Sequence, residues 1–356
     1  MKIGVLTGGS DAPGLNAVLR AVVRTAIHRY GMDVMGVGRG FEGLLSPPEL
    51  WPLSPGDMRG FERRGGTILG TCNRGSPFRA GGEDRSAEVG ESLRWLGLDG
   101  LICIGGDGSL AIASRLADMG VPLVGVPKTV ENDICGTGVT FGFSTAVETA
   151  TFAIDKLQTA SENHHQVMYL EVTGRHSGWV ALSAGIAGGA DAILIPEVGV
   201  RYEVLNEMIE RRTGQGKECT VVVVAEGVRE AGHDEPLYKR ADVQALGGAA
   251  THVAAQVRAL AEGNGVQHRV TVLGHLQRGG DPNPHDRVLA TRFGAAAVAA
   301  VHDGHFGTMV AIQGNAMNQV PLTDTVGKKN TVGTDNALVW TAQSLGVSLG
   351  ERPEAL

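Results

Sequence analysis

The segment Gly105–Ser109, with the sequence GGDGS, directly follows the apolar run at 100–104. Glycines allow a backbone to approach phosphate groups, and the N–H groups at the start of a following helix favour an anion. An aspartate in such a loop is suited to hold the Mg²⁺ that accompanies phosphates, which assigns Asp107 to the metal. The pattern therefore indicates phosphoryl chemistry.

A second segment, 127–133, places two carboxylates beside a hydroxyl and an amine: Glu131 and Asp133 stand with Thr129 and Lys128. In phosphoryl transfer to an alcohol, one carboxylate takes the hydroxyl proton, while a hydroxyl, a cation and a metal stabilise the phosphate oxygens. These residue types match that division of labour. Taken alone, the segment is better read as an exposed turn with solvated charges.

Basic side chains flank a later apolar run. Arg269 precedes it, and His275 and Arg278 follow it. Two guanidiniums and an imidazole suit a phosphate dianion. A lone histidine after an apolar strand is more often structural, but the arginine three positions later weakens that reading. The segment Thr173-Gly174-Arg175 and Glu226 also lie where predicted strands end.

The elements that must position these residues alternate between short apolar runs and Ala-rich amphipathic stretches, which predicts βα units and a parallel sheet. Four loops, the first three of them glycine-bearing, are expected after strands, at the sheet edge where ligands bind: 8–14, 65–67, 105–109 and 127–133. Predicted strands are 2–6, 100–104, 123–126, 167–172, 192–195 and 220–225. Predicted helices are 14–28, 109–119, 145–161, 201–212 and 246–262. No structure is predicted from Gly327 onward.

The composition is that of a soluble globular protein. The 356 residues suffice for two domains, with 42% hydrophobic and 19% charged residues. The net charge of −7 argues against nucleic acid and anionic membranes as partners. The four cysteines form no CxxC pair, and the sequence lacks GxxxxGK[ST] and a GxGxxG in the first loop. With no signal peptide or membrane span expected, a cytoplasmic enzyme is predicted.

Taken together, these motifs resemble the phosphofructokinase family. The resemblance is carried by residues 8–16, 65–70, 105–109, 127–134, 171–189, 224–227 and 271–280. It implies an α/β fold of two Rossmann-like lobes with mainly parallel sheets: residues 1–142 plus 277–326 form the nucleotide-binding lobe, and residues 143–276 plus 327–356 form the sugar-phosphate-binding lobe. It also implies a homo-oligomer, dimer or tetramer, with shared active sites.

The activity implied by the resemblance is a glycolytic kinase reaction with Mg²⁺. The γ-phosphate of ATP passes to the C1 hydroxyl of fructose 6-phosphate, giving fructose 1,6-bisphosphate. The residues implied for ATP are Gly9, Arg74, Gly106, Asp107, Gly108 and Ser109, with Asp107 on the metal. The residues implied for the transferred phosphate and the attacking hydroxyl are Thr129, Val130, Glu131 and Asp133, with Glu131 as the base. The residues implied for the sugar phosphate are Gln166, Thr173, Gly174, Arg175, Glu226, His275, Leu276, Gln277 and Arg278, with Arg269 from a neighbouring subunit. Arg175 also counts among the catalytic residues.

The resemblance bears on the phosphate donor in two ways. Gly108 is the form that leaves room for the α-phosphate of ATP, where an aspartate favours pyrophosphate. Lys128 resembles a lysine found in pyrophosphate users and in a mixed group of ATP users. We follow Gly108, because a carboxylate beside the α-phosphate is a direct clash and a lysine is not.

The chain departs from the family pattern around the acceptor. Glu131 replaces an aspartate and is longer by one methylene, Gln166 replaces an arginine, and Thr173 replaces a methionine, while Asn73 precedes Arg74 with an assumed shift of one residue. These departures keep open a pyrophosphate-dependent enzyme, a different acceptor such as sedoheptulose 7-phosphate, or a catalytically weak sugar-phosphate sensor or regulatory subunit. NAD kinases share the GGDG-type loop but not the TGR and GHLQRGG segments.

Effector binding is a further open question. Arg20, Arg24 and Lys217 match effector-binding positions of regulated bacterial members, whereas Gln158 and Gln215 stand where other basic residues would be. Arginines on a helix face are more often solvated than bound to a ligand.

Overall fold

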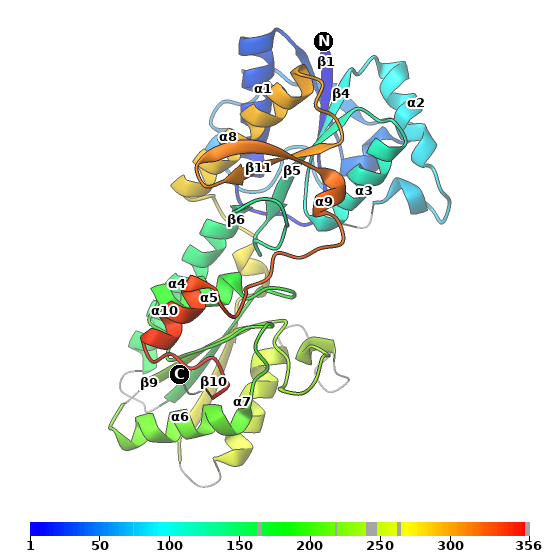
Figure 1. Ribbon diagram of the computed structural model, residues 1–356. Coiled ribbons are helices and arrows are strands. Elements are labelled where there is room, and N and C mark those ends of the chain that lie inside the picture. The colour runs from blue at the N-terminus through cyan, green and yellow to red at the C-terminus, as the bar shows by residue number, and fades with distance from the viewer. Residues whose placement is uncertain (74, 162–165, 218, 240–247, 262–264, 353–356) are drawn as a thin grey trace. The chain divides into compact units, whose positions relative to one another are not determined.

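The computed structural model describes residues 1–73, 75–161, 166–217, 219–239, 248–261 and 265–352, and the chain divides into two compact units (Figure 1). The first unit comprises Met1–Val130, Ile134–Thr145 and Arg278–Lys328, and the second comprises Glu131–Asp133, Ala146–Gln277 and Lys329–Leu356. The short segment Glu131–Asp133 thus belongs to the second unit, although both of its flanks belong to the first.

The first unit is built on one mainly parallel sheet with the strand order β12-β11-β5-β4-β1-β2-β3, in which β6 also pairs with β5. The strands are β1 (Lys2–Thr7), β2 (Asp33–Val37), β3 (Leu50–Pro52), β4 (Gly100–Gly105), β5 (Leu123–Thr129), β6 (Phe141–Gly142), β11 (Thr308–Gln313) and β12 (Ala316–Pro321). Only β3 and β12, at the two edges of this described sheet, pair antiparallel with their neighbours.

Helices cover both faces of this sheet. They are α1 (Leu15–Tyr30), α2 (Ser86–Leu96), α3 (Asp107–Asp118), α8 (Pro284–His302) and α9 (Leu322–Thr325). In β4, Ile102 and Ile104 belong to the core cluster shared with α1 and α8, which lie side by side, whereas Leu101 and Cys103 belong to the cluster shared with α2 and α3 (Figure 1). Because both faces are buried, the strand is a continuous apolar run rather than an alternating one.

The order of the central strands determines where a ligand can bind. The chain passes from β1 to β2 on one side, whereas β4 lies on the other side of β1. Open parallel sheets bind ligands at such a reversal, outside the carboxyl ends of the strands. The loops after β1 and β4 meet there, and the Gly8 N–H donates to the Ile104 carbonyl at 2.8 Å.

The second unit contains a four-stranded parallel sheet with the order β10-β7-β9-β8. The strands are β7 (Gln166–Val172), β8 (Ala192–Leu194), β9 (Cys219–Ala225) and β10 (Gln267–Val272). The helices are α4 (Phe143–Ser161), α5 (Trp179–Ala187), α6 (Tyr202–Gly214), α7 (Gly248–Leu260) and α10 (Ala337–Ser344). The core cluster includes Val167 and Tyr169 of β7, which pack with α6 and α7, while the edge strand β10 exposes Val270 and Val272.

The predicted α/β class with mainly parallel sheets is confirmed. One detail is wrong: the loop at 65–67 follows a short 3₁₀ turn, Phe61–Arg63, rather than a strand. The elements β2, β11, α2, α5 and α8 were not predicted, and α10 lies in the tail for which no structure was predicted. The start of the predicted helix 246–262 lies partly outside the described residues. In the part of the chain that the structure describes, no helix has the length and hydropathy of a membrane span.

Candidate active site

The candidate phosphate-binding loop lies in the first unit between β4 and α3, with Gly106 as the residue before the helix. Gly105 of this loop and Gly8, which follows β1, are packed against Ser109. A Cβ on Gly105 would lie 2.3 Å from the Cβ of Ser109, and a Cβ on Gly8 would lie 2.6 Å from its Oγ. A side chain at Gly105 would therefore collide with Ser109, and one at Gly8 would require the Ser109 hydroxyl to move.

Gly108 differs from these neighbours. It is exposed in the first turn of α3, and a Cβ built on it would meet no atom within 4 Å. A glycine inside a helix costs about 0.5–1 kcal/mol relative to alanine, so the fold alone does not favour a glycine at this position. The open space beside the Gly108 backbone is available to a ligand.

Asp107 is half-buried at the start of α3, where the helix dipole favours negative charge on a ligand or side chain. Among the described residues, no three histidine, cysteine or acidic side chains are grouped as metal ligands. This donor set fits Mg²⁺, which commonly takes one or two carboxylates and completes its shell with water and substrate phosphates. Asp107 is thus suited to hold a metal together with a bound nucleotide.

Lys128 supplies a buried cation beside the loop. Its Nζ donates to the Ser10 carbonyl, and a Cβ on Gly9 would lie 3.5 Å from that Nζ. Burial lowers the pKa of Lys128 to about 8; the guanidinium of Arg278 acts in the same direction and the carboxylate of Asp11 opposes it. The structure therefore brings Gly9, Lys128 and Arg278 together, whereas Arg74 lies outside the described residues.

The catalytic candidate Glu131 lies in the second unit with both carboxylate oxygens held. Oε1 accepts from the Thr173 hydroxyl at 3.1 Å, and Oε2 accepts from the Arg175 backbone N–H at 3.1 Å. The Glu131 carbonyl accepts from the Ser177 hydroxyl, also at 3.1 Å. Because Glu131 is only 7% exposed, these donors fix the direction in which its carboxylate points.

The other residues of the 127–133 segment have different environments. Asp133 is buried, and its Oδ2 accepts from the Lys329 ammonium at 2.8 Å. Val130 is fully buried, so only its backbone is available to a ligand. Thr129 ends β5, and its carbonyl accepts from the Thr140 hydroxyl at 2.8 Å. Within this segment, the Glu131 carboxylate accepts from a hydroxyl and a backbone N–H, whereas the Asp133 carboxylate accepts from an ammonium group.

Arg175 and Glu226 form an ion pair at the ends of β7 and β9, with Nε 2.9 Å from Oε1. The Glu226 carboxylate raises the pKa of the Arg175 guanidinium, which also lies over the Tyr238 ring at 5.9 Å. The turn after β7 requires a glycine at position 174, which has φ of 146°, because a Cβ built there would lie 2.6 Å from the Ser177 carbonyl oxygen. The pair presents both charge signs at the carboxyl edge of the sheet.

The remaining candidates for binding the acceptor lie in different environments. Gln166 donates to the Gln267 side chain at 3.2 Å, and that same oxygen accepts from Arg269 at 3.0 Å. His275 and Leu276 are exposed on a short 3₁₀ turn.

Gln277 is 1% exposed, and its amide oxygen accepts from the Thr173 N–H at 2.7 Å. This engagement favours a positioning role for Gln277 rather than direct contact with substrate.

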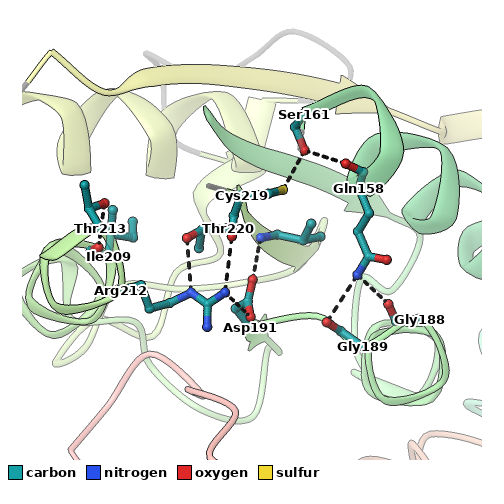
Figure 2. Close-up of polar contacts among 11 residues, drawn as sticks. Gln158, Ser161, Gly188, Gly189, Asp191, Ile209, Arg212, Thr213, Cys219 and Thr220 are labelled. Atoms are coloured by element: carbon teal, nitrogen blue, oxygen red, sulfur yellow. Dashed lines mark hydrogen bonds and ion pairs between the residues drawn. The ribbon is translucent and has the colours of Figure 1, made fainter. Parts of the chain in front are cut away.

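Two of the positions considered for effector binding, Gln158 and Arg20, have internal contacts, as does Arg212; Figure 2 shows those of Gln158 and Arg212. Gln158 donates to the carbonyls of Gly188 and Gly189 at 2.9 and 3.4 Å. Arg212 pairs with Asp191 at 2.7 Å and donates to Thr220 of β9 at 3.2 Å, so its guanidinium ties α6 to the sheet (Figure 2). In the first unit, Arg20 pairs with Glu62 at 3.1 Å.

Sequence reasoning missed Lys329 and Asn330, which contact the 131–133 segment. No local pattern marks them, because Lys329 lies 196 residues away from Asp133 along the chain. A lysine in a tail without predicted structure carries no sequence signal for such a contact.

A glycine-rich loop at the strand reversal of a parallel sheet, with a buried carboxylate loop elsewhere in the chain, fits an α/β phosphotransferase. The family model for phosphofructokinase matches residues 2–301. The chain is 47% identical to an ATP-dependent 6-phosphofructokinase of Chloroflexus aggregans, covering 98% of each chain. It is 46% identical to a pyrophosphate–fructose 6-phosphate 1-phosphotransferase of Amycolatopsis methanolica, covering 93% of this chain and 96% of the relative.

The solved structure of phosphofructokinase from Saccharomyces cerevisiae superposes with a TM-score of 0.78 at 35% identity, covering 90% of this chain. This chain spans 45% of the yeast chain. The protein therefore belongs to the phosphofructokinase family.

Proposed function

We propose that this phosphofructokinase transfers the γ-phosphate of ATP to the C1 hydroxyl of fructose 6-phosphate, forming fructose 1,6-bisphosphate and ADP in cytoplasmic glycolysis. The observation that carries the proposal is the Glu131 carboxylate, which is buried and held by donors from Thr173 and Arg175. A fixed carboxylate is what proton removal from a sugar hydroxyl requires. The names of relatives such as the Chloroflexus enzyme support the same reaction.

In the proposed step, Glu131 accepts the C1 hydroxyl proton as the oxygen attacks the γ-phosphorus. The bond between that phosphorus and the β–γ bridging oxygen breaks, and ADP leaves with the bond electrons. The N–H groups of Gly106, Gly108 and Ser109 at the start of α3 bind nucleotide oxygens, and Asp107 is the residue that would hold Mg²⁺. When bound, Mg²⁺ neutralises phosphate charge.

For the donor, the supporting observation is the open space beside Gly108, which admits an α-phosphate. Pyrophosphate is the second candidate donor, because Lys128 lies beside the loop and the Amycolatopsis relative is named for pyrophosphate. The two relatives differ by one percentage point in identity to this chain, so overall similarity does not discriminate between the donors.

For the acceptor, we propose that Thr173, Gly174, Arg175 and Glu226 bind the sugar, that Gln166 lies at its margin, and that His275 and Arg278 bind its 6-phosphate. Arg269 lies in the edge strand β10, whose side chains are largely exposed. Because an exposed edge strand is available to another copy of the chain, we assign Arg269 to the site of a neighbouring subunit in a homo-oligomer.

A kinetic matrix of two donors, ATP and pyrophosphate, against two acceptors, fructose 6-phosphate and sedoheptulose 7-phosphate, tests the proposal. We expect the highest kcat/KM for ATP with fructose 6-phosphate. A higher value with pyrophosphate would replace the donor, and a higher value with sedoheptulose 7-phosphate would replace the acceptor. Absence of turnover of fructose 6-phosphate with both donors would refute the proposed function and favour a sensor role.

A further inference from the structure

The chain after Lys328 returns to the second unit alongside the 131–133 segment. The Lys329 Nζ lies 2.8 Å from Asp133 Oδ2, and the Asn330 N–H donates to the Asp133 carbonyl at 3.0 Å. The Asn330 side-chain amide donates to the Asn132 carbonyl at 2.9 Å. Two consecutive residues thus supply three contacts to the loop that carries Glu131.

The returning segment is itself anchored next to the start of α5. The Asn330 carbonyl accepts from the Trp179 indole N–H at 2.9 Å. The Val332 N–H donates to Glu197 Oε1 at 2.7 Å, and the same carboxylate accepts from the Gly178 N–H at 3.0 and 3.1 Å. Because Ser177 in turn donates to the Glu131 carbonyl, the contacts form a closed circuit around the loop.

The loop needs such support for two physical reasons. Asn132 has φ of +53°, a left-handed conformation that non-glycine residues adopt rarely and that surrounding contacts must hold. Asp133 is only 7% exposed, and a buried carboxylate without a partner is strongly unfavourable. Asn330 stabilises the left-handed conformation of Asn132 by donating to its carbonyl, and Lys329 compensates the negative charge of the buried Asp133 carboxylate.

We propose that Lys329 and Asn330 are positioning residues for the phosphoryl transfer. They act through Asp133 and Asn132 to hold the backbone of the loop and thereby the direction of the Glu131 carboxylate. The inference rests on the proposed function, in which Glu131 takes the hydroxyl proton. It assigns the C-terminal segment a role in kcat rather than in binding of the nucleotide.

The test compares Lys329→Met with Lys328→Met, a matched control at an exposed neighbouring lysine. Because displacement of a catalytic group by about 1 Å costs up to about 100-fold, we expect kcat with ATP and fructose 6-phosphate to fall about 10- to 100-fold in Lys329→Met. The KM for ATP should stay within about twofold of native, since the same nucleotide contacts remain. Lys329→Arg, which keeps the charge, should recover most of the kcat.

A second variant, Asn330→Ala, removes the side-chain contact to Asn132 and keeps the backbone contacts. We expect a smaller fall in kcat, and this variant carries the test if Lys329→Met does not fold. Equal kcat for the Lys329 and Lys328 variants beside normal native turnover would refute the positioning role alone. A lowered melting temperature with native kcat per folded molecule would also refute it. Absence of native turnover would instead refute the proposed function, and the inference would fall with it.

Discussion

Substitution of Gly108 by aspartate is predicted to stabilise the protein while impairing its use of ATP. A Cβ at this position would meet no atom within 4 Å. It lies in the first turn of α3, where an acidic residue interacts favourably with the helix dipole and has a better helix propensity than glycine. These two effects together raise the free energy of unfolding by about 0.5–1 kcal/mol.

The effect on ATP has the opposite sign. A carboxylate about 5 Å from a phosphate charge, at an effective dielectric constant of about 20, gives a repulsion of about 3 kcal/mol, or about a 100-fold loss. We therefore expect kcat/KM for ATP to fall about 100-fold in Gly108→Asp. Pyrophosphate has no α-phosphate, so any turnover with pyrophosphate should be equal or higher.

The assay measures kcat/KM for both donors and the melting temperature of each variant. Gly90→Asp, in the middle of α2, controls for the same chemical change on a helix outside the site. Unchanged kcat/KM for ATP in Gly108→Asp would refute the assignment of this space to the nucleotide. A melting temperature well below native would refute the claim that the fold tolerates a side chain there.

Three further outcomes are expected. Glu131→Gln removes the proposed base and should lower kcat by about 10²- to 10⁴-fold with a native melting temperature, whereas native kcat would contradict the assignment. Thr173→Val removes the hydroxyl donor to Glu131 Oε1, and loss of one hydrogen bond of about 1 kcal/mol predicts a fall in kcat of about fivefold. Burial lowers the pKa of Lys128 to about 8 from 10.5, so between these pH values the unfolded chain binds more protons and native stability should rise with pH. Lys128→Met should lack that rise in stability, which amounts to at most about 3 kcal/mol over the interval. The free energy of unfolding is measured by denaturant unfolding of the ligand-free protein at pH 7.5 and about pH 10. The same change in stability with pH in the native protein and in Lys128→Met would contradict the burial argument.

The sequence predicted six strands, β1, β4, β5, β7, β8 and β9, and the glycine loop after β4 because these are local patterns, whereas β2 and β11 were not predicted. A strand covered on both faces is a continuous apolar run, and the glycines of 105–109 stand directly after one. The helix α10 was missed because it has only eight residues and its sequence lacks a strong helical periodicity of apolar residues. The loop at 65–67 was misplaced because glycines alone do not show what precedes a turn.

The positions around the candidate base were predictable by type but not by contact. Glu131 and Thr173 were selected separately, as a carboxylate and as a departure from a family pattern. The structure joins them through a hydrogen bond of 3.1 Å. The hydroxyl at position 173 therefore donates a hydrogen bond to the longer carboxylate at 131, and a methionine at position 173 would have no such donor. Two departures that looked independent in the sequence are thus one coupled feature, which a double-mutant comparison of the pair would measure.

Gly105 and Gly108 show why a glycine motif by itself leaves the donor open. Composition and spacing alone do not distinguish the two residues; only the family resemblance singles out Gly108. In the structure, a Cβ on Gly105 would collide with Ser109, whereas a Cβ on Gly108 would meet nothing. The first glycine is required by packing and carries no information about the ligand. The second is not required by packing, so the absence of its side chain matters only for a ligand that binds at the start of α3. The ATP proposal therefore depends on Gly108 and not on the number of glycines around it.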